Sequence, residues 1–167
     1  MKRYLLLVVF LSFHFISGYA QNYKMHTVFI FSFTRYIEWP DTYNSGDFEI
    51  MVLGDSPIVD ELKAMAAVKK VGERNIKVIR INSVSEIRKC NILFVPATKS
   101  ADIADVMGKV TTQSILVITE EPGLGAKGSN VNFITKDGKL AFELNQNAAS
   151  RQGLKISNEL SRLAILI

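Results

Sequence analysis

Four short apolar segments, each of a length suited to one buried β-strand, recur along this chain with helical segments between them. They are residues 48–53 (FEIMVL), 76–81 (IKVIRI), 91–95 (NILFV) and 114–119 (SILVIT). A strand, a helix and a further strand in this order form a right-handed crossover and give parallel neighbours in one sheet. Segments that are apolar throughout are typical of strands covered on both faces. The sequence therefore predicts a mainly parallel sheet with helices on both sides.

Helix signals surround these strands. We expect Ser56 and Ser100 to be N-cap residues for two of the helices, and Pro40 to end the first helix because the residue before a proline avoids the α region. The expected helices are residues 23–39, 57–70, 84–88 and 101–109.

The pattern changes after residue 119. Residues 131–135 and 139–144 read as two strands joined by Lys136-Asp137-Gly138, a typical hairpin turn. We expect Asn145 to cap a last helix over residues 146–166, although Gly153 lowers its stability by about 1 kcal/mol relative to alanine. The expected fold class is α/β: a three-layer sandwich, mainly parallel, with an antiparallel hairpin at one edge (Rossmann-like, but not nucleotide-binding).

The N-terminus has the three parts of a signal peptide. Lys2 and Arg3 precede an apolar stretch at residues 5–16, and Gly18 and Ala20 stand at positions −3 and −1 of a cleavage site. The alternative is a membrane anchor, but the apolar run is shorter than the roughly 20 residues that a span needs. We expect residues 1–20 to be removed, and residues 21–167 to form a single periplasmic domain without direct membrane insertion.

Composition excludes several function classes. Loss of 20 residues from 167 leaves 147, and the formal charge falls from +4 to +2 because Lys2 and Arg3 leave with them. With scattered basic residues, we expect no nucleic-acid partner. Cys90 is the only cysteine, so an intramolecular disulfide is excluded, and a buried thiol is favoured over an intermolecular bridge.

The sequence GLGAKG at residues 123–128 is a literal GxGxxG directly after a buried strand. A dinucleotide fingerprint needs a helix after the glycines, whose N-terminus holds the pyrophosphate. Here the glycines lead into a predicted strand, and export also argues against a nucleotide cofactor. We therefore interpret Gly123, Gly125 and Gly128 as a flexible loop that can serve partner binding, and we expect no cofactor.

Catalytic and metal-binding patterns are sparse. His26 is the only histidine after residue 20, and it lies in an apolar helix where a satisfied core histidine is the default. His26 and Cys90 are too few for a zinc site, and no serine stands in a nucleophile elbow. Glu120 follows the carboxyl end of a strand, where α/β proteins place ligands. We expect no catalytic residue and no metal, and a hydrolase is disfavoured.

Three segments together resemble the YfiR/HmsC-like family of exported bacterial proteins. They are FIFSFTRYIEWP at residues 29–40, the strand and glycine loop at residues 114–134, and the closing segment at residues 139–166. The resemblance spans the expected mature chain in the family's order. It implies a periplasmic, non-enzymatic α/β domain that represses or modulates a membrane-bound sensor, such as a diguanylate cyclase or a histidine kinase, and so acts on cyclic di-GMP signalling and biofilm formation.

This chain departs from relatives with several cysteines, so a switch based on an internal disulfide does not carry over. The alternative function is a periplasmic receptor for a small ligand, with its pocket near Asp55, Pro96 and Glu120, and a homodimer is left open. Trp39 serves either core packing or recognition. The residues expected to bind a partner or ligand are Trp39, Glu120, Gly123, Gly125, Gly128, Phe142, Glu143 and Asn145.

Overall fold

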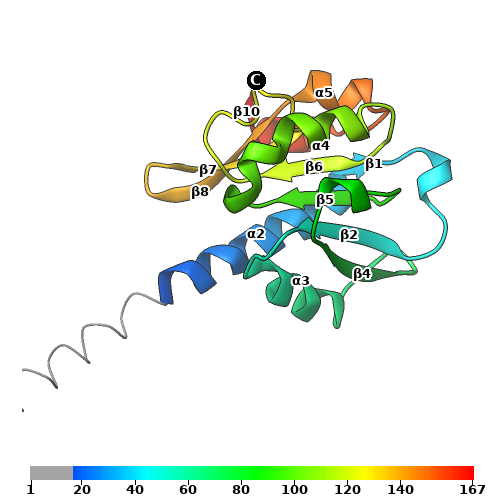
Figure 1. Ribbon diagram of the computed structural model, residues 1–167, viewed down its shortest axis with the longest axis horizontal. Helices are drawn as coiled ribbons and strands as arrows, with labels where there is room; N and C mark the ends of the chain where they lie inside the picture. Colours follow the sequence, from blue (N-terminus) through cyan, green and yellow to red (C-terminus); the bar gives the residue numbers. More distant parts are fainter. Residues whose placement is uncertain (1–16) are drawn as a thin grey trace, which may run out of the picture.

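A computed structural model describes the backbone of residues 17–167 and the side chains of residues 23–167. Within this range the chain forms an eight-stranded sheet in the order β10-β8-β7-β6-β5-β2-β4-β3 (Figure 1). The five neighbours from β7 to β4 are mutually parallel. β8 is antiparallel to β7 and β3 is antiparallel to β4, whereas β10 is parallel to β8. The strands are β2 (Phe48–Leu53), β3 (Lys70–Val71), β4 (Arg74–Ile81), β5 (Ile92–Val95), β6 (Leu116–Thr119), β7 (Val131–Lys136), β8 (Lys139–Leu144) and β10 (Ile165–Leu166).

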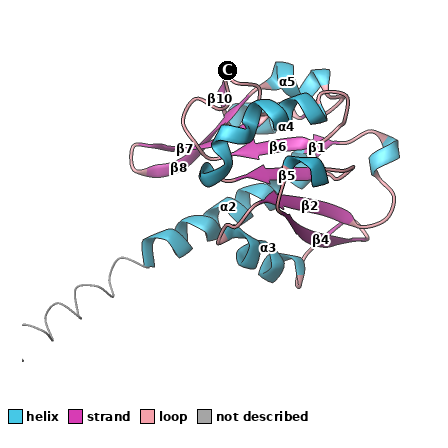
Figure 2. Cartoon of the chain, viewed as in Figure 1, coloured by secondary structure: helices cyan, strands magenta, loops and turns pink. Residues whose placement is uncertain are grey.

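Helices cover both faces of this sheet (Figure 2). The α-helices are α2 (Ser17–Tyr36), α3 (Ile58–Ala66), α4 (Ile103–Val110), α5 (Gln146–Arg151) and α6 (Asn158–Leu163). Short 3-10 helices lie at η1 (Asp41–Tyr43), η2 (Val84–Glu86) and η3 (Ala97–Asp102). A separate two-stranded sheet pairs β1 (Ile37–Glu38) with β9 (Lys155–Ile156). The predicted fold class, a mainly parallel α/β sheet with an antiparallel hairpin, is confirmed.

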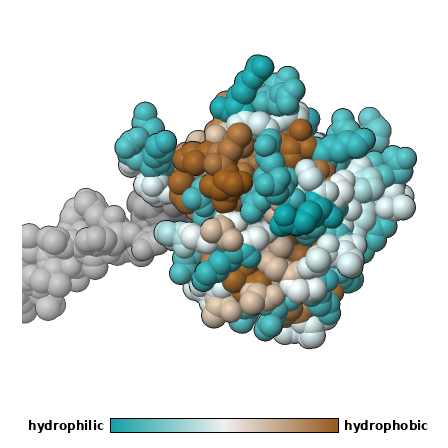
Figure 3. Space-filling model, turned by 90° about the horizontal axis from the view of Figure 1, so that it is seen from above, coloured by the Kyte–Doolittle hydropathy of each residue, from teal (hydrophilic) through white to brown (hydrophobic). Residues whose placement is uncertain are grey.

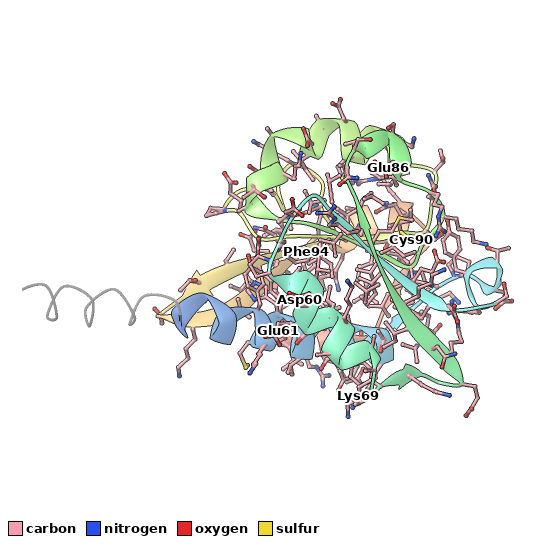
Figure 4. The ribbon with its side chains drawn as sticks, turned by 60° about the horizontal axis from the view of Figure 1, so that its bottom comes forward. Asp60, Glu61, Lys69, Glu86, Cys90 and Phe94 are labelled. Atoms are coloured by element: carbon pink, nitrogen blue, oxygen red, sulfur yellow. The ribbon has the colours of Figure 1, made fainter. Side chains whose placement is uncertain are left out.

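Successive residues of each central strand point into two different cores. On β5, Ile92 and Phe94 pack into a core with α2 and α3, whereas Leu93 and Val95 pack into a core under α4. This alternation follows from the two-residue period of a strand, and it explains why the strand is apolar throughout. Cys90 joins the second core as a buried free thiol, as expected (Figure 4).

The predicted strand at 48–53 matches β2 residue for residue, and the predicted hairpin is present as β7 and β8. Asp137 and Gly138 both have positive φ, 51° and 72°, which is the backbone of a type I′ turn. Asn145 caps α5, and its side chain accepts a hydrogen bond from the Ala148 amide.

The predicted helix over residues 146–166 is wrong. The helix ends at Arg151, and Gly153 adopts φ +74°, the left-handed conformation that closes helices at glycine. The remaining residues form β9, which pairs with β1, then α6, and then β10, which pairs with β8. Backbone pairing with distant strands outweighs the weak helical propensity of a glycine-containing segment.

Three further helix boundaries differ, two of them for the same reason. The first helix ends at Tyr36 instead of residue 39, because Ile37–Glu38 pairs with β9 as β1. The second stops at Ala66 instead of residue 70, because Lys70–Val71 pairs with β4 as β3. Around residues 97–102 the chain forms a 3-10 helix first, so α4 begins at Ile103 and Ser100 is not its cap.

The predicted signal peptide lies mainly outside the described residues, and Ser17–Ala20 belong to α2. Within the described range, no helix is both long enough and apolar enough to cross a membrane.

Candidate functional site

A cleft of about 460 Å³ lies at the carboxyl ends of the parallel strands, between the N-terminal half of α2 and the β7–β8 hairpin. In Figure 1 this is the left side, where β5 and β6 end and the hairpin turn projects. We call it the strand-end cleft. Its lining residues are His26, Glu120, Pro122, Gly123, Phe133, Ile134, Thr135, Leu140 and Glu143.

Glu120 joins three elements at the back of this cleft. It follows β6 directly, and its Oε1 accepts hydrogen bonds from the Tyr23 hydroxyl at 3.1 Å and from the Ala97 amide at 3.1 Å. Its Oε2 lies 3.7 Å from Nε2 of His26, and the Glu120 side chain is 10% exposed. One carboxylate therefore holds α2 against the ends of both β5 and β6, and its nearly complete burial strengthens these contacts.

His26 is seated by aromatic rings. Its imidazole packs edge-on against Phe133 of β7, with 4.3 Å between ring centroids, and lies 5.3 Å from the ring of Tyr23. Phe33 continues the contact along α2 and packs on Phe142 of β8 at 5.1 Å. The aromatic stripe of α2 thus fixes the helix on the hairpin, and this packing closes the cleft on one side.

Glu143 forms the opposite wall. Its Oε2 accepts a hydrogen bond of 2.8 Å from the side-chain amide of Asn132, whose Oδ1 accepts one of 2.7 Å from the Thr119 hydroxyl. Thr119 also contacts the Ser129 hydroxyl at 2.9 Å. Thr119, Ser129 and Asn132 are buried. A satisfied polar chain therefore runs under the cleft from β6 through β7 to β8, and it fixes the direction of the carboxylate.

A family model described as YfiR/HmsC-like matches residues 23–165. The chain belongs to the YfiR/HmsC-like family. The matched range begins in α2 and ends in β10, so in this YfiR/HmsC-like protein it contains every residue that lines the strand-end cleft. Among curated proteins, nothing matches the sequence.

The structure brings together three of the residues expected to bind a partner: Glu120, Gly123 and Glu143 line the strand-end cleft of this YfiR/HmsC-like protein. Gly125 and Asn145 adjoin it. The Asn145 amide donates to the Gly125 carbonyl at 3.1 Å, and a side chain on Gly125 would come within 2.9 Å of Glu143 Oε2. The glycine loop therefore packs closely against one acidic wall of the cleft.

The other three expected residues lie apart. Phe142 is buried in the core with α2. Gly128 lines a different hollow beside Met107 of α4. Trp39 is 8% exposed, and its indole N–H donates to the Asn91 carbonyl at 3.0 Å. That hydrogen bond satisfies the polar atom of Trp39 inside the core.

The sequence analysis did not include Tyr23 or His26 among the expected site residues, although these two α2 residues contact Glu120. One signal for His26 was present, because a lone histidine in an aromatic helix needs a polar partner. The partner itself, far along the chain, is fixed only by the fold. The glycine loop leads into β7 and not into a helix, as expected for a loop that is no dinucleotide fingerprint.

Proposed function

We propose that this chain is an exported, non-enzymatic regulator that binds the extracytoplasmic part of a membrane-bound sensor, such as a diguanylate cyclase or a histidine kinase. The observation that carries the proposal is the YfiR/HmsC-like match, which covers residues 23–165 and so the whole sheet from β2 to β8. The family is known for periplasmic regulators of diguanylate cyclases. Residues 21–167 would then be the mature domain.

The strand-end cleft supports a binding role through its charge. Glu120 and Glu143 line it together with His26, and among residues 23–167 no lysine or arginine does. Each carboxylate is held in place by hydrogen bonds to other parts of the fold. A preformed acidic cleft of this kind favours a basic side chain of a partner, since a fixed carboxylate needs no ordering at the moment of binding.

Regulation follows from differential binding. A sensor that alternates between two states shifts toward the state that the regulator binds better. Each tenfold preference corresponds to about 1.4 kcal/mol. A regulator that prefers the inactive state therefore lowers cyclic di-GMP without chemistry of its own.

The test removes the gene from its host and measures cyclic di-GMP. We expect the level to rise, and the intact gene to restore it. A Glu120→Gln/Glu143→Gln variant, which keeps the hydrogen-bond acceptors and removes the charges, should restore it poorly. Glu159→Gln is the matched control, because Glu159 is exposed on α6 away from the cleft lining.

Two results would contradict the proposal. An unchanged cyclic di-GMP level together with unchanged phosphorylation of the host's sensor kinases would remove the regulatory role. Equal restoration of the cyclic di-GMP level by the double variant and the control would show that the strand-end cleft takes no part in this regulation.

The second candidate function is a receptor for a small ligand in the same cleft. Of the three residues expected near its pocket, Glu120 lines this cleft, whereas Asp55 and Pro96 are not among the lining residues. Its volume, about 460 Å³, falls within the usual range of small-molecule sites. A thermal-shift screen of small cationic compounds tests it. A ligand present at 100 times its Kd should stabilise the protein by about 2.7 kcal/mol, and the Glu120→Gln/Glu143→Gln variant should lose that gain.

A further inference from the structure

A groove of about 580 Å³ runs between α2 and α3, and its lining shares no residue with that of the strand-end cleft. Figure 4 shows the two helices side by side, with Glu61 near the start of α3 and Lys69 beyond its end. We call it the α2–α3 groove. Its lining residues are Lys24, Thr27, Val28, Phe31, Ser32, Arg35, Glu61, Ala64, Met65, Val68 and Lys69.

The side chains of α2 that line the groove recur at helical spacing. Val28, Phe31 and Arg35 lie at positions i, i+3 and i+7 of α2, and so form one row along the helix. They differ from the row of α2 that faces the sheet, to which Ile30 and Phe33 belong. Rows of this kind on two packed helices form the trough into which the side chains of a third helix fit.

Much of the lining of the groove is apolar, and part of this apolar lining is open to solvent. Val28 is 58% exposed and Val68 is 77% exposed, and both stand among the few large apolar side chains exposed in the described part of the chain. The nearby hydroxyls of Thr27 and Ser32 donate to carbonyls of their own helix, at 2.8 and 2.9 Å. The walls therefore offer apolar contact more than hydrogen-bond donors. Neighbouring exposed apolar side chains with a polar rim mark interaction sites.

The rim is basic. Lys24, Arg35 and Lys69 line the groove, and of the side chains that the structure describes Glu61 is the single acidic one that does so. Within residues 23–167, the ion pairs use other cations than these three. Arg35 and Lys69 instead lie over the ring of Phe31, 5.0 and 5.7 Å from its centroid. Two cations are thus held beside the apolar lining, outside the ion pairs formed by the described residues.

We propose that the α2–α3 groove docks an amphipathic helix of a protein partner, with apolar residues along one side and carboxylates flanking them. The lining residues recur at helical spacing on both sides of the groove, at 28, 31 and 35 of α2 and at 61, 64, 65 and 68 beside them, and this arrangement favours a helix as the occupant. The basic rim selects carboxylates. This surface is independent of the strand-end cleft and of the identity of the sensor.

The test uses a fluorescent model peptide, an amphipathic helix with Leu at i, i+3, i+4 and i+7 and Glu at the flanking positions. A second peptide carries Lys in place of Glu. Fluorescence anisotropy with the exported protein should show binding of the acidic peptide at least tenfold tighter than of the basic one at low salt. Val28→Asp/Val68→Asp should weaken the acidic peptide at least tenfold, and Arg35→Glu/Lys69→Glu should reverse the preference.

The control variants carry the same changes elsewhere. Leu163→Asp is exposed on α6, and Lys139→Glu is exposed on β8; both lie outside the groove lining and should bind the acidic peptide like the unchanged protein. Because Val28 and Val68 are exposed, their variants should keep the melting temperature of the unchanged protein. Glu120→Gln/Glu143→Gln should also keep peptide binding, so failure of the proposed regulatory function leaves this result untouched.

Three results would overturn the proposal. The first is equal binding of both peptides, and the second is equal binding by the groove variants and the controls. The third is groove-dependent binding to vesicles of phosphatidylglycerol and phosphatidylcholine without binding of the acidic peptide, which would assign the surface to a membrane. A photo-crosslinker at Val68 in living cells provides the second measurement: a crosslinked segment that is acidic and amphipathic supports the proposal, and a second copy of this chain overturns it.

Discussion

The hydroxyl of Tyr23 donates a hydrogen bond of 3.1 Å to Oε1 of Glu120, across 97 positions of the sequence. This contact joins the early turns of α2 to the end of β6, and the Ala97 amide adds the end of β5 to the same oxygen. One largely buried carboxylate therefore adds to the aromatic packing that attaches α2, and it forms the back of the strand-end cleft.

Glu120→Ala should destabilise the protein by about 1–3 kcal/mol, because it leaves the Tyr23 hydroxyl and the Ala97 amide without this acceptor. Glu120→Gln should cost less, since its amide oxygen still accepts. Urea denaturation measures both. Glu121→Ala is the control at the neighbouring position and should change stability by no more than about 0.5 kcal/mol. Equal losses at the two positions would contradict the anchoring role of Glu120.

Gln152→Ala should be more damaging, at about 2–3 kcal/mol. The buried Gln152 amide donates to the carbonyls of Val110, Gln113 and Ile115 at 3.3–3.4 Å, and its Oε1 accepts from Asn130 at 2.6 Å. Truncation leaves these polar groups in the interior without the hydrogen bonds that Gln152 supplies. Asn147→Ala is the matched control, because Asn147 is exposed on α5, the helix that Gln152 follows directly. Thermal unfolding of the two variants should show a lower Tm for Gln152→Ala alone.

Cys90 should resist thiol reagents in the folded protein. Burial, reinforced by the charge of Glu49, raises the pKa of its thiol to about 12. Almost none is thiolate near pH 8, and the thiolate is the reactive form. Labelling with a chromogenic disulfide reagent should be slow in buffer and complete in urea. Fast labelling of the folded protein would contradict the burial of this residue.

The same pKa predicts a loss of stability at alkaline pH. Above about pH 8.5 the unfolded thiol loses its proton, while the folded thiol keeps it up to about pH 12. The unfolded state then binds fewer protons, so the free energy of unfolding falls by up to about 1.4 kcal/mol per pH unit in this window. Between pH 8 and 10.5, stability should fall more steeply for the unchanged protein than for Cys90→Ala. Parallel pH curves would contradict this.

Gly108→Ala should stabilise the protein by about 0.5–1 kcal/mol. Gly108 lies inside α4, and a Cβ added there would meet nothing within 4 Å. Alanine restricts the unfolded chain and favours the helix. Gly138→Ala is the contrasting change: it has equally open space but φ +72°, so it should destabilise the hairpin. Chemical denaturation of both variants should give shifts of opposite sign.

The central strands were predictable from local patterns. A strand buried on both faces is apolar at every position, and such a run can be recognised from adjacent residues without knowledge of the fold. The type I′ turn at Asp137-Gly138 and the cap at Asn145 were predictable for the same reason, since both depend on residues close in sequence. Of the strand-end cleft, Glu120 was predictable as the residue after a buried strand. Tyr23 and His26 were not, because nothing near them in the sequence shows what they contact.

The sequence by itself determined that residues 48–119 build a parallel sheet and that residues 131–144 close it with a hairpin, because strand period, helix caps and turn residues act locally. Only the tertiary structure decided which secondary-structure elements residues 146–166 form. There Gly153 ends α5, and Lys155–Ile156 and Ile165–Leu166 pair with strands far along the chain. The apolar spacing of this segment is compatible with a helix, but its backbone can also pair with neighbouring strands. Strand pairing prevails here because the folded sheet supplies backbone hydrogen-bond partners, and these exist only once the sheet has formed.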